Sequence, residues 1–344
     1  MRKRILFLMV GILLILSLAF VQGCGSSDSG DGNQEQNQEG TQGQEKVEKP
    51  GDYPNRTVNI IIPYGPGGGS DSFVRMMGKI ANEIEGFPSV CVNVPGAGSI
   101  TGLTQLTTSD PDGYTIASLT SDYITCDVFD TTELTVDDFK WVIRGCINAS
   151  MIFANSKSEK FKTWDDVIAE AKARPGEITV GITSIGDEVV LAALRQHGVD
   201  LKGVMTQTPA ERFSSLVGGH LDLILEQPGD GVSFLEAGQI KALLSLTDER
   251  LTGFEDAPSS MELGYEVTYP YWRGIVAHKD TPDEIVNYLH DVFKKVIETD
   301  EFKQYLHEKY MDSQDAYLGK DDFYQASKEE VELYENIAKE VGMK

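Results

Sequence analysis

The segment that constrains this chain most joins a strand-like run to a helix-like run through a series of glycines. Residues 57–63 are apolar and β-branched, which predicts a buried strand, and residues 70–85 place apolar side chains at helical spacing. The connection reads Pro63-Tyr64-Gly65-Pro66-Gly67-Gly68-Gly69-Ser70-Asp71. Three successive glycines let backbone N–H groups approach a ligand, and a helix start adds a partial positive charge. The loop therefore predicts an anion site that needs no basic side chain.

A nucleotide is not the anion that this loop predicts. A P-loop ends in Gly-Lys-Ser/Thr, whereas Gly69-Ser70-Asp71 has no lysine, and the spacing differs from the GxGxxG dinucleotide motif. A second loop of the same kind, Asn93–Ser99, again runs from a strand to a helix. Two such loops at two strand ends would face the same cleft. The alternative interpretation of the first loop is a plain flexible turn.

Strand and helix patterns alternate along the rest of the chain. Strands are expected at residues 57–63, 90–94, 114–118, 179–182, 221–225 and 240–246. Helices are expected at residues 70–85, 100–108, 163–173, 208–218, 281–299 and 321–341, the fourth and fifth opening with Thr-Pro-x-Glu boxes. This order predicts an α/β fold with mixed sheets flanked by helices. Two such sets in sequence predict two lobes with a ligand cleft between them. The acid-rich last helix is expected to be a solvated face.

The N-terminus is typical of an export signal. Arg2, Lys3 and Arg4 precede an apolar run over residues 5–20, which is shorter than the ~20 residues of a membrane span. The run ends at Gly23-Cys24, as in bacterial lipoprotein signals, so we expect residues 1–23 to be removed and Cys24 to be lipidated. The alternative is a signal anchor with an incidental cysteine. Residues 25–52 contain one apolar side chain, Val47, and are expected to form a disordered tether that buries nothing.

The composition excludes several classes of protein. Lys and Arg total 30 against 54 Asp and Glu, a net charge of −24 that repels nucleic-acid phosphates. There is no HExxH and no paired CxxC, so neither a metal nor a cofactor is expected. After lipidation, Cys91, Cys126 and Cys146 remain and allow one disulfide at most.

Several motifs resemble the tripartite tricarboxylate transporter solute-binding receptor family. The resemblance rests on Tyr53-Pro54 with residues 58–71, Asn93-x-Pro95-Gly96-Ala97-Gly98, Asp112–Thr115, Ala173–Gly176, Gly218–Asp222 and Gly264–Val267. It covers the chain from about Tyr53 to the C-terminus. It implies a periplasmic-binding-protein type II fold in which main-chain amides hold a ligand carboxylate.

The resemblance implies a receptor rather than an enzyme. We expect a monomer, exported and lipid-anchored on the outer face of the cytoplasmic membrane or periplasmic, that captures a small carboxylate-bearing metabolite and delivers it to a membrane permease. The first alternative is a receptor that presents its ligand to a membrane sensor. The second is a hydrolase that uses Asp187 and Glu226 as a carboxylate pair.

Residues 53–148 plus 273–344 are expected to form the first lobe and residues 149–272 the second, with crossings near 147–150 and 271–274. The expected ligand-binding residues of the first lobe are Tyr64, Gly65, Gly67, Gly68, Gly69, Ser70, Asp71, Gly96, Ala97, Gly98 and Ser121. Those of the second lobe and the crossing are Thr183, Ser184, Gly186, Asp187, Glu226 and Trp272.

The second lobe departs from the family pattern. Residues 183–188 and 206–209 lack the usual His and Lys, and Asp187, Glu188 and Glu226 add acids. Like charges repel, so we predict a monocarboxylate with an amino or other donor group, such as an amino acid, over citrate-like anions. Asp187 could instead cap the following helix. Trp272 lies in the cleft or in the core, and Arg273 binds an anion or, the slightly favoured interpretation, pairs with Glu226.

Overall fold

The computed structural model describes residues 46–312 and 316–344. The expected signal peptide, Cys24 and most of the tether lie outside the described residues. Residues 46–344 form one unit. No helix within the described ranges is long and apolar enough to cross a membrane.

The first sheet has the strand order β2-β1-β3-β10-β4. Its strands are β1 (Val58–Ile62), β2 (Ser89–Asn93), β3 (Thr115–Thr120), β4 (Phe139–Ala149) and β10 (Pro270–His278). β1, β2 and β3 run parallel, whereas β10 is antiparallel to both β3 and β4. The parallel arrangement brings the carboxyl ends of three strands to one edge, which is where ligands bind in open α/β sheets.

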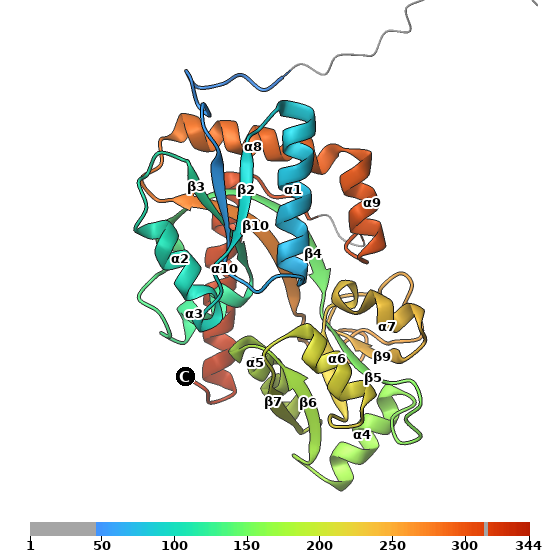
Figure 1. Cartoon of the computed structure of the whole chain (residues 1–344). Coiled ribbons are helices and arrows are strands. Elements are labelled where there is room, and N and C mark those ends of the chain that lie inside the picture. The colour runs from blue at the N-terminus through green and yellow to red at the C-terminus, as the bar shows by residue number, and fades with distance from the viewer. Residues whose placement is uncertain (1–45, 313–315) are drawn as a thin grey trace, which may run out of the picture. The chain divides into compact units, whose positions relative to one another are not determined.

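Helices cover both faces of this sheet (Figure 1). Alternate strand residues pack on opposite faces: Ile60 and Ile62 join one apolar cluster, and Ile61 joins another. The first cluster includes side chains from α1 (Gly69–Glu85), α8 (Asp283–Glu298) and α9 (Asp300–Glu308). The second includes side chains from α2 (Ile100–Thr107), α3 (Asp122–Val128) and α10 (Lys320–Glu340). The sheet is thus buried on both sides.

The second sheet has the order β7-β6-β8-β5-β9. Its strands are β5 (Met151–Asn155), β6 (Ile178–Ile182), β7 (Leu201–Met205), β8 (Leu223–Glu226) and β9 (Ile240–Ser245). Its helices are α4 (Trp164–Ala173), α5 (Ile185–Gln196), α6 (Pro209–Val217) and α7 (Val232–Glu236). β6, β7 and β8 are parallel, so their carboxyl ends also share one edge. Short 3-10 helices lie at Ala97–Ser99, Val136–Asp138 and Pro228–Gly231.

Only Ser150 separates β4 of the first sheet from β5 of the second. In Figure 1 the chain passes from the upper sheet to the lower one where β4 leads into β5. The return to the first sheet is made by residues 246–269, which lead into β10. The two-sheet α/β fold expected from the sequence is confirmed, while the exact lobe boundaries stay a prediction.

Two local expectations were wrong. The helix expected from residue 281 begins at Asp283, and the buried Thr281 hydroxyl does not cap it, because it has no hydrogen-bond partner within residues 46–312 and 316–344. Val47 is half-buried against the α1–α8 side of the first sheet, and its N–H donates to the Glu85 carboxylate at 3.0 Å. The end of the expected tether is therefore attached to the folded unit, because Val47 is apolar enough to bury a side chain there.

Candidate functional site

The two glycine-rich loops follow neighbouring parallel strands. Ile62, the last residue of β1, pairs with Asn93, the last residue of β2. The Asn93 side-chain amide donates to the Tyr64 carbonyl at 3.1 Å and to the Asp71 carboxylate at 2.9 Å, which ties the two loops together. Ser121, after β3, lies at the same edge because β3 is parallel to β1. The sequence-predicted loops are thus brought together at one end of the sheet.

The Asp71 side chain stabilises the first glycine-rich loop through hydrogen bonds. Its carboxylate accepts hydrogen bonds from the Gly67 N–H at 3.0 Å, from Arg75 at 2.9 Å and from Asn93. Although burial alone would raise the pKa of Asp71, these donors hold it below its usual value. The first N–H groups of α1 have no partners within the helix, as at any helix start. They remain available to an anion beside Gly68 and Gly69.

Close packing around residue 69 leaves no room for a side chain, so this position requires glycine. A Cβ added at this residue would lie 2.2 Å from Arg273 Nη2 and 2.5 Å from an Asp230 oxygen. Arg273 comes from β10, whereas Asp230 follows β8 in the second sheet, and the two side chains approach to 3.6 Å. Arg273 Nε also lies 3.4 Å from the Ser70 hydroxyl. A buried guanidinium is therefore packed against the start of α1.

The second loop is built from four consecutive residues with positive φ. Gly96, Ala97, Gly98 and Ser99 have φ of 145°, 46°, 63° and 95°. Only glycine adopts such angles readily, so the two non-glycine residues store backbone strain. The Ser99 hydroxyl is buried and has no hydrogen-bond partner among the described residues. Such strain is typical of ligand-binding loops.

A hydrogen-bonded network connects the loops to β10. The Tyr64 hydroxyl lies 2.6 Å from the Thr120 hydroxyl, and the Tyr271 hydroxyl donates to an Asp122 oxygen at 2.6 Å. Burial, together with the nearby Asp187 carboxylate, raises the pKa of Asp122 to about 6. Burial also raises the pKa of Tyr64 and of Tyr271.

On the second sheet, Asp187 forms a capping box at the start of α5 with Ser184, the N-cap residue. Its carboxylate accepts from the Thr183 N–H at 2.7 Å and the Ser184 N–H at 3.1 Å, while the Ser184 hydroxyl accepts from the Asp187 N–H at 3.3 Å. Burial raises the pKa of Asp187, and these donors oppose the rise. Close by, a Cβ on Gly186 would lie 2.8 Å from Thr125 of α3, so α5 meets the first sheet's edge here.

Glu226 has an internal partner that sequence reasoning missed. It forms a buried ion pair with Arg212 of α6, and each side chain is only 2% exposed. Arg212 Nη1 donates to the Thr206 hydroxyl at 2.9 Å. The expected pairing of Arg273 with Glu226 was therefore wrong, because Arg212 already occupies that carboxylate and Arg273 faces Asp230. The local sequence Thr-Pro-Ala-Glu-Arg predicts a helix start but does not indicate which acid Arg212 contacts.

Trp272 lies on the opposite face of β10 from Arg273. Its indole packs edge-on against Phe323, with ring centroids 5.0 Å apart, and its N–H donates to Glu330 of α10 at 2.6 Å. It is 2% exposed, so in this structure it is a core side chain. Cys91, Cys126 and Cys146 are all free thiols.

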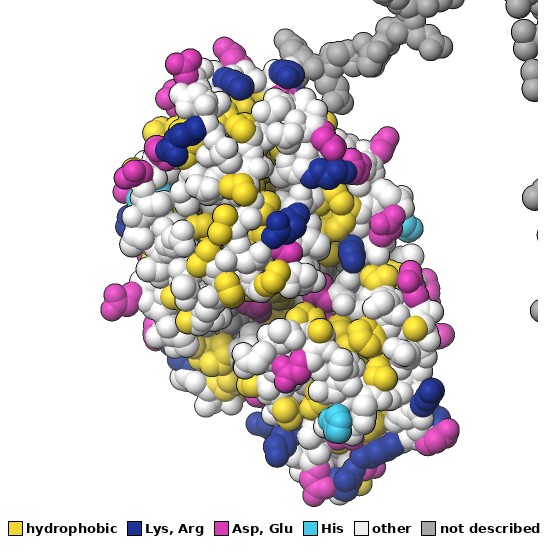
Figure 2. Space-filling model, viewed as in Figure 1, with side chains coloured by type: hydrophobic (Ala, Val, Ile, Leu, Met, Phe, Trp, Pro, Cys, Tyr) yellow, Lys and Arg dark blue, Asp and Glu magenta, His cyan; other side chains and the backbone are white. Residues whose placement is uncertain are grey.

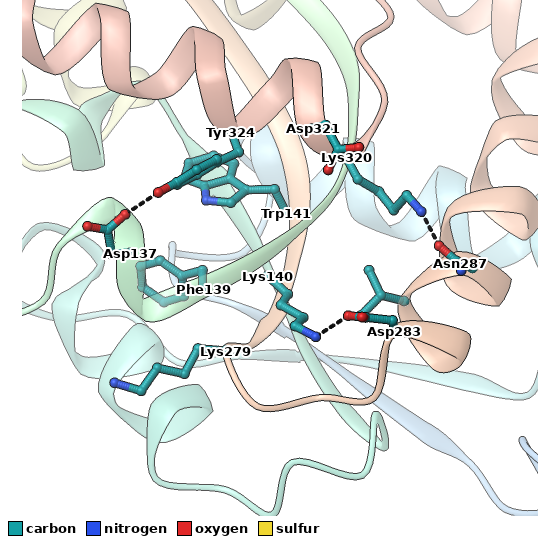
Figure 3. A pocket seen from close by; sticks show the side chains of 11 residues that line it. Asp137, Phe139, Lys140, Trp141, Lys279, Asp283, Asn287, Lys320, Asp321 and Tyr324 are labelled. Carbon is teal, nitrogen blue, oxygen red and sulfur yellow. Dashed lines mark hydrogen bonds and ion pairs between the residues drawn. The ribbon is translucent and has the colours of Figure 1, made fainter.

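The surface has two hollows that could be considered as ligand sites. Figure 2 shows the surface hollowed between the part that carries α1 and the part that carries α6, with acidic side chains in it. A separate pocket of about 760 Å³ lies between β4, α8 and α10 (Figure 3). Its lysines have partners: Lys140 contacts Asp283, and Lys320 contacts Asn287. The first hollow, where the parallel strands end, is the candidate site.

Comparison with known proteins identifies the family of this chain. Residues 73–343, far more than half of the chain, match the model of the "Tripartite tricarboxylate transporter family receptor". The chain belongs to this receptor family. It is thus a solute-binding receptor of an exported, periplasmic-binding type, and the family is not one of enzymes.

Three solved structures are similar to this receptor over most of its length. A TctC solute-binding protein from Polaromonas is 26% identical, with 84% of this chain and 99% of that chain covered and a TM-score of 0.66. A Rhodopseudomonas palustris protein with bound malate is 22% identical (83% and 99% covered, TM-score 0.72). An R. palustris protein with adipate is 23% identical (85% and 99% covered, TM-score 0.77). The last two likenesses establish the fold alone.

Proposed function

We propose that this chain is an exported, lipid-anchored receptor that captures a small carboxylate and delivers it to a membrane permease. Family membership supports the receptor role. The malate and adipate bound by two neighbours are small carboxylates, which supports the ligand class. Cys24, which lies outside the described residues, would carry the anchor.

The ligand class is inferred from a local positive charge in an otherwise acidic protein. The start of α1 and the Arg273 guanidinium lie against each other, with no side chain at Gly69 to separate them. A helix start favours negative charge by about 0.3–1 kcal/mol when exposed and by more when buried. A carboxylate is the small anion that suits both donors, because it accepts hydrogen bonds through two oxygens.

Because the proposed site lies between the two lobes, ligand binding would close the lobes around the ligand. The first lobe (residues 53–148 plus 273–344) supplies the glycine-rich loops, and the second lobe (residues 149–272) supplies Thr183, Ser184 and Asp230. A ligand that contacts both lobes shifts an open–closed equilibrium by its preference for the closed form. The closed receptor then docks on the permease, which reads closure as the signal of a bound ligand.

Calorimetry on the full chain in detergent tests this function. The titrants are acetate, butyrate, succinate, adipate, malate, citrate and a set of amino acids, and bound material is recovered by mass spectrometry. We expect at least one carboxylate to bind and to be released unchanged. Failure of every carboxylate to bind, or recovery of a chemically altered compound, would contradict the proposal.

Gly68→Val adds a structural control to that titration. A Cβ at residue 68 meets nothing closer than the Gly65 carbonyl at 3.9 Å, so the fold is expected to survive. The larger side chain would block the approach of an anion to the helix start. The loss should be about 1–3 kcal/mol, the scale of an unsatisfied buried polar group. Wild-type affinity in the folded variant would remove the loop from the site.

A further inference from the structure

Unpaired polar atoms gather around one aromatic side chain, Tyr271. Arg273 Nη1, Asn148 Nδ2, Asn148 Oδ1 and Asp122 Oδ1 are all buried and have no hydrogen-bond partner among the described residues. Arg273 is 2% exposed and Asn148 is 1% exposed. Buried polar groups are nearly always hydrogen-bonded, so a cluster without partners within the protein points to a bound molecule.

The strand register places these groups together. Tyr271 of β10 pairs directly with Asn148 of β4, and Arg273 follows two residues along the same strand. Paired residues and residues two apart share one face of a sheet, so all three side chains project toward the α1 side. The Arg273 guanidinium lies 5.1 Å from the Tyr271 ring centre, and the Tyr271 hydroxyl donates to Asp122 at 2.6 Å. A cation and an acid therefore flank one ring.

The neighbouring charges are already matched inside the protein. Arg212 pairs with Glu226 at 2% exposure, and the Asp187 carboxylate accepts the N–H groups of Thr183 and Ser184, just before α5. Arg273 Nε lies 3.4 Å from the Ser70 hydroxyl, and Asp230 lies 3.6 Å from Arg273, beyond hydrogen-bonding distance. Arg273 Nη1 has no hydrogen-bond partner among the described residues. One oxygen of Asp122 accepts from Tyr271, and the Ser184 hydroxyl opposes the rise that burial causes in the pKa of this carboxyl group. The other oxygen has no hydrogen-bond partner among the described residues. The unmatched groups are thus one donor-rich cation and one acceptor-rich acid.

We infer that the ligand is an amino-carboxylate whose carboxylate binds Arg273 and the start of α1, and whose ammonium binds Asp122, with the Asn148 amide between them. This inference rests on the proposed function and specifies its ligand. The acids that suggested an amine from the sequence were Asp187, Glu188 and Glu226. In the folded protein the acid beside Tyr271 with a buried oxygen that lacks a partner among the described residues is Asp122.

A dicarboxylate fits the same groups less well. Its second carboxylate would lie beside Asp122 and close to Asp187, and like charges in a water-poor site repel strongly. A simple monocarboxylate would leave the Asp122 oxygen unpaired. An ammonium group instead gives a charge-assisted hydrogen bond, which is about twice as strong as a neutral one.

Matched sets of compounds test the inference on the wild-type full chain. The sets are alanine and propionate; 4-aminobutyrate, butyrate and succinate; and 6-aminohexanoate, hexanoate and adipate. In at least one set we expect the amino-carboxylate to bind about tenfold or more tightly than its partners, the scale of a hydrogen bond to a charged group. If carboxylates bind but the amine adds nothing in every set, the inference fails while the proposed function stands. If none of these compounds binds, and the wider carboxylate panel also fails, the proposed function fails as well.

Variants then assign the two ends of the ligand. Asp122→Asn should lose about tenfold or more for the amino-carboxylate and little for the carboxylate without an amine. Arg273→Gln should weaken both, and Arg273→Lys, which keeps the charge, should recover part of the loss. Asp321→Asn, an exposed residue at the start of α10, is the charge-matched control. Thermal unfolding verifies that each variant folds. Equal losses for both compounds in folded Asp122→Asn would overturn the assignment of the ammonium end.

Discussion

At the scale of single residues, burial sets the behaviour of the acids in this very acidic protein. Glu330 was expected to lie on a solvated face of the last helix. Its carboxylate instead faces inward and accepts the Trp272 indole N–H at 2.6 Å, and its second oxygen has no hydrogen-bond partner among the described residues. Burial raises the pKa of Glu330 to about 7. The ionised form is therefore disfavoured in the folded state.

This shift makes stability depend on pH. The unfolded pKa of Glu is about 4.3, so between about pH 4.3 and 7 the folded state binds more protons than the unfolded state. The contribution of Glu330 to stability is fully present below that range and is lost as the pH rises through about 7. We expect Glu330→Gln to raise the free energy of unfolding by about 1–3 kcal/mol at pH 8 and to leave it nearly unchanged at pH 4. Urea unfolding at both pH values measures this.

Glu329→Gln is the matched control for that experiment. Glu329 is the exposed neighbour on the same helix, and its change should be small and equal at both pH values. A Glu330→Gln variant that is less stable than wild type at pH 8 would contradict the assignment. It would mean that the folded protein stabilises the ionised carboxylate of Glu330 in spite of its burial.

Gly69 gives a second prediction at this scale. Replacing it by alanine would favour the helix by about 0.5–1 kcal/mol, but the added Cβ lies 2.2 Å from Arg273 Nη2. Overpacking of this kind costs about 1–3 kcal/mol, so we expect net destabilisation and weaker carboxylate binding. Gly68→Ala, which has open space, should change stability by no more than about 1 kcal/mol. Thermal unfolding and calorimetry compare the pair, and equal behaviour of the two variants would contradict the packing argument.

Residue partners were the least predictable part of the site. Asp71 at a helix start and the capping alternative for Asp187 could be read from local spacing, because both involve residues within four positions. The partners of Glu226 and Arg273 could not, since Arg212 and Asp230 reach them only through the packing of separate elements. Nothing in the sequence around Asn148 distinguishes it from an ordinary strand residue.

At the scale of elements, the pattern of apolar residues was a good guide where strand and helix alternate locally. β1, α1, β2 and α2 lie within a residue or two of the predicted ranges. β4 and β10 were not predicted, although they pair along nearly their whole length, because that pairing joins segments more than a hundred residues apart. α5 was also missed, since its start was interpreted only as a ligand loop.

The cap of α5 offers a prediction for an element. Asp187 accepts two backbone N–H groups at the helix start, so Asp187→Ala should cost about 1–2 kcal/mol of stability. Asp187→Asn should cost less, because its side-chain oxygen can still accept. Ligand affinity should change little in either variant. A large affinity loss at unchanged stability would place the Asp187 carboxylate on the ligand instead.

At the scale of the whole molecule, the boundary between tether and folded unit lies earlier than the composition suggested. Val47 packs on the first sheet's side, and its N–H donates to Glu85, whose other oxygen accepts from Lys295 at 2.7 Å. Glu85 is itself only 6% exposed. Losing the Val47 donor would leave part of a buried carboxylate without its partner, so these few residues belong to the fold.

Two internal deletions separate tethering from folding. Removing residues 25–45 should change neither stability nor ligand affinity, because it leaves the Val47 contact intact. Removing residues 25–52 should lower stability by about 1 kcal/mol, the scale of one hydrogen bond, again with unchanged affinity. Urea unfolding and calorimetry with the tightest compound of the panel compare both deletions with the full chain. Equal stability of the two deletions would show that Val47 adds nothing to the fold, and a large loss of affinity in either would show that the segment contributes to the site. We expect the longer deletion to lower stability without changing ligand affinity. The reason is that Val47 contacts Glu85 at the C-terminal end of α1, whereas the ligand-binding groups lie at the start of α1.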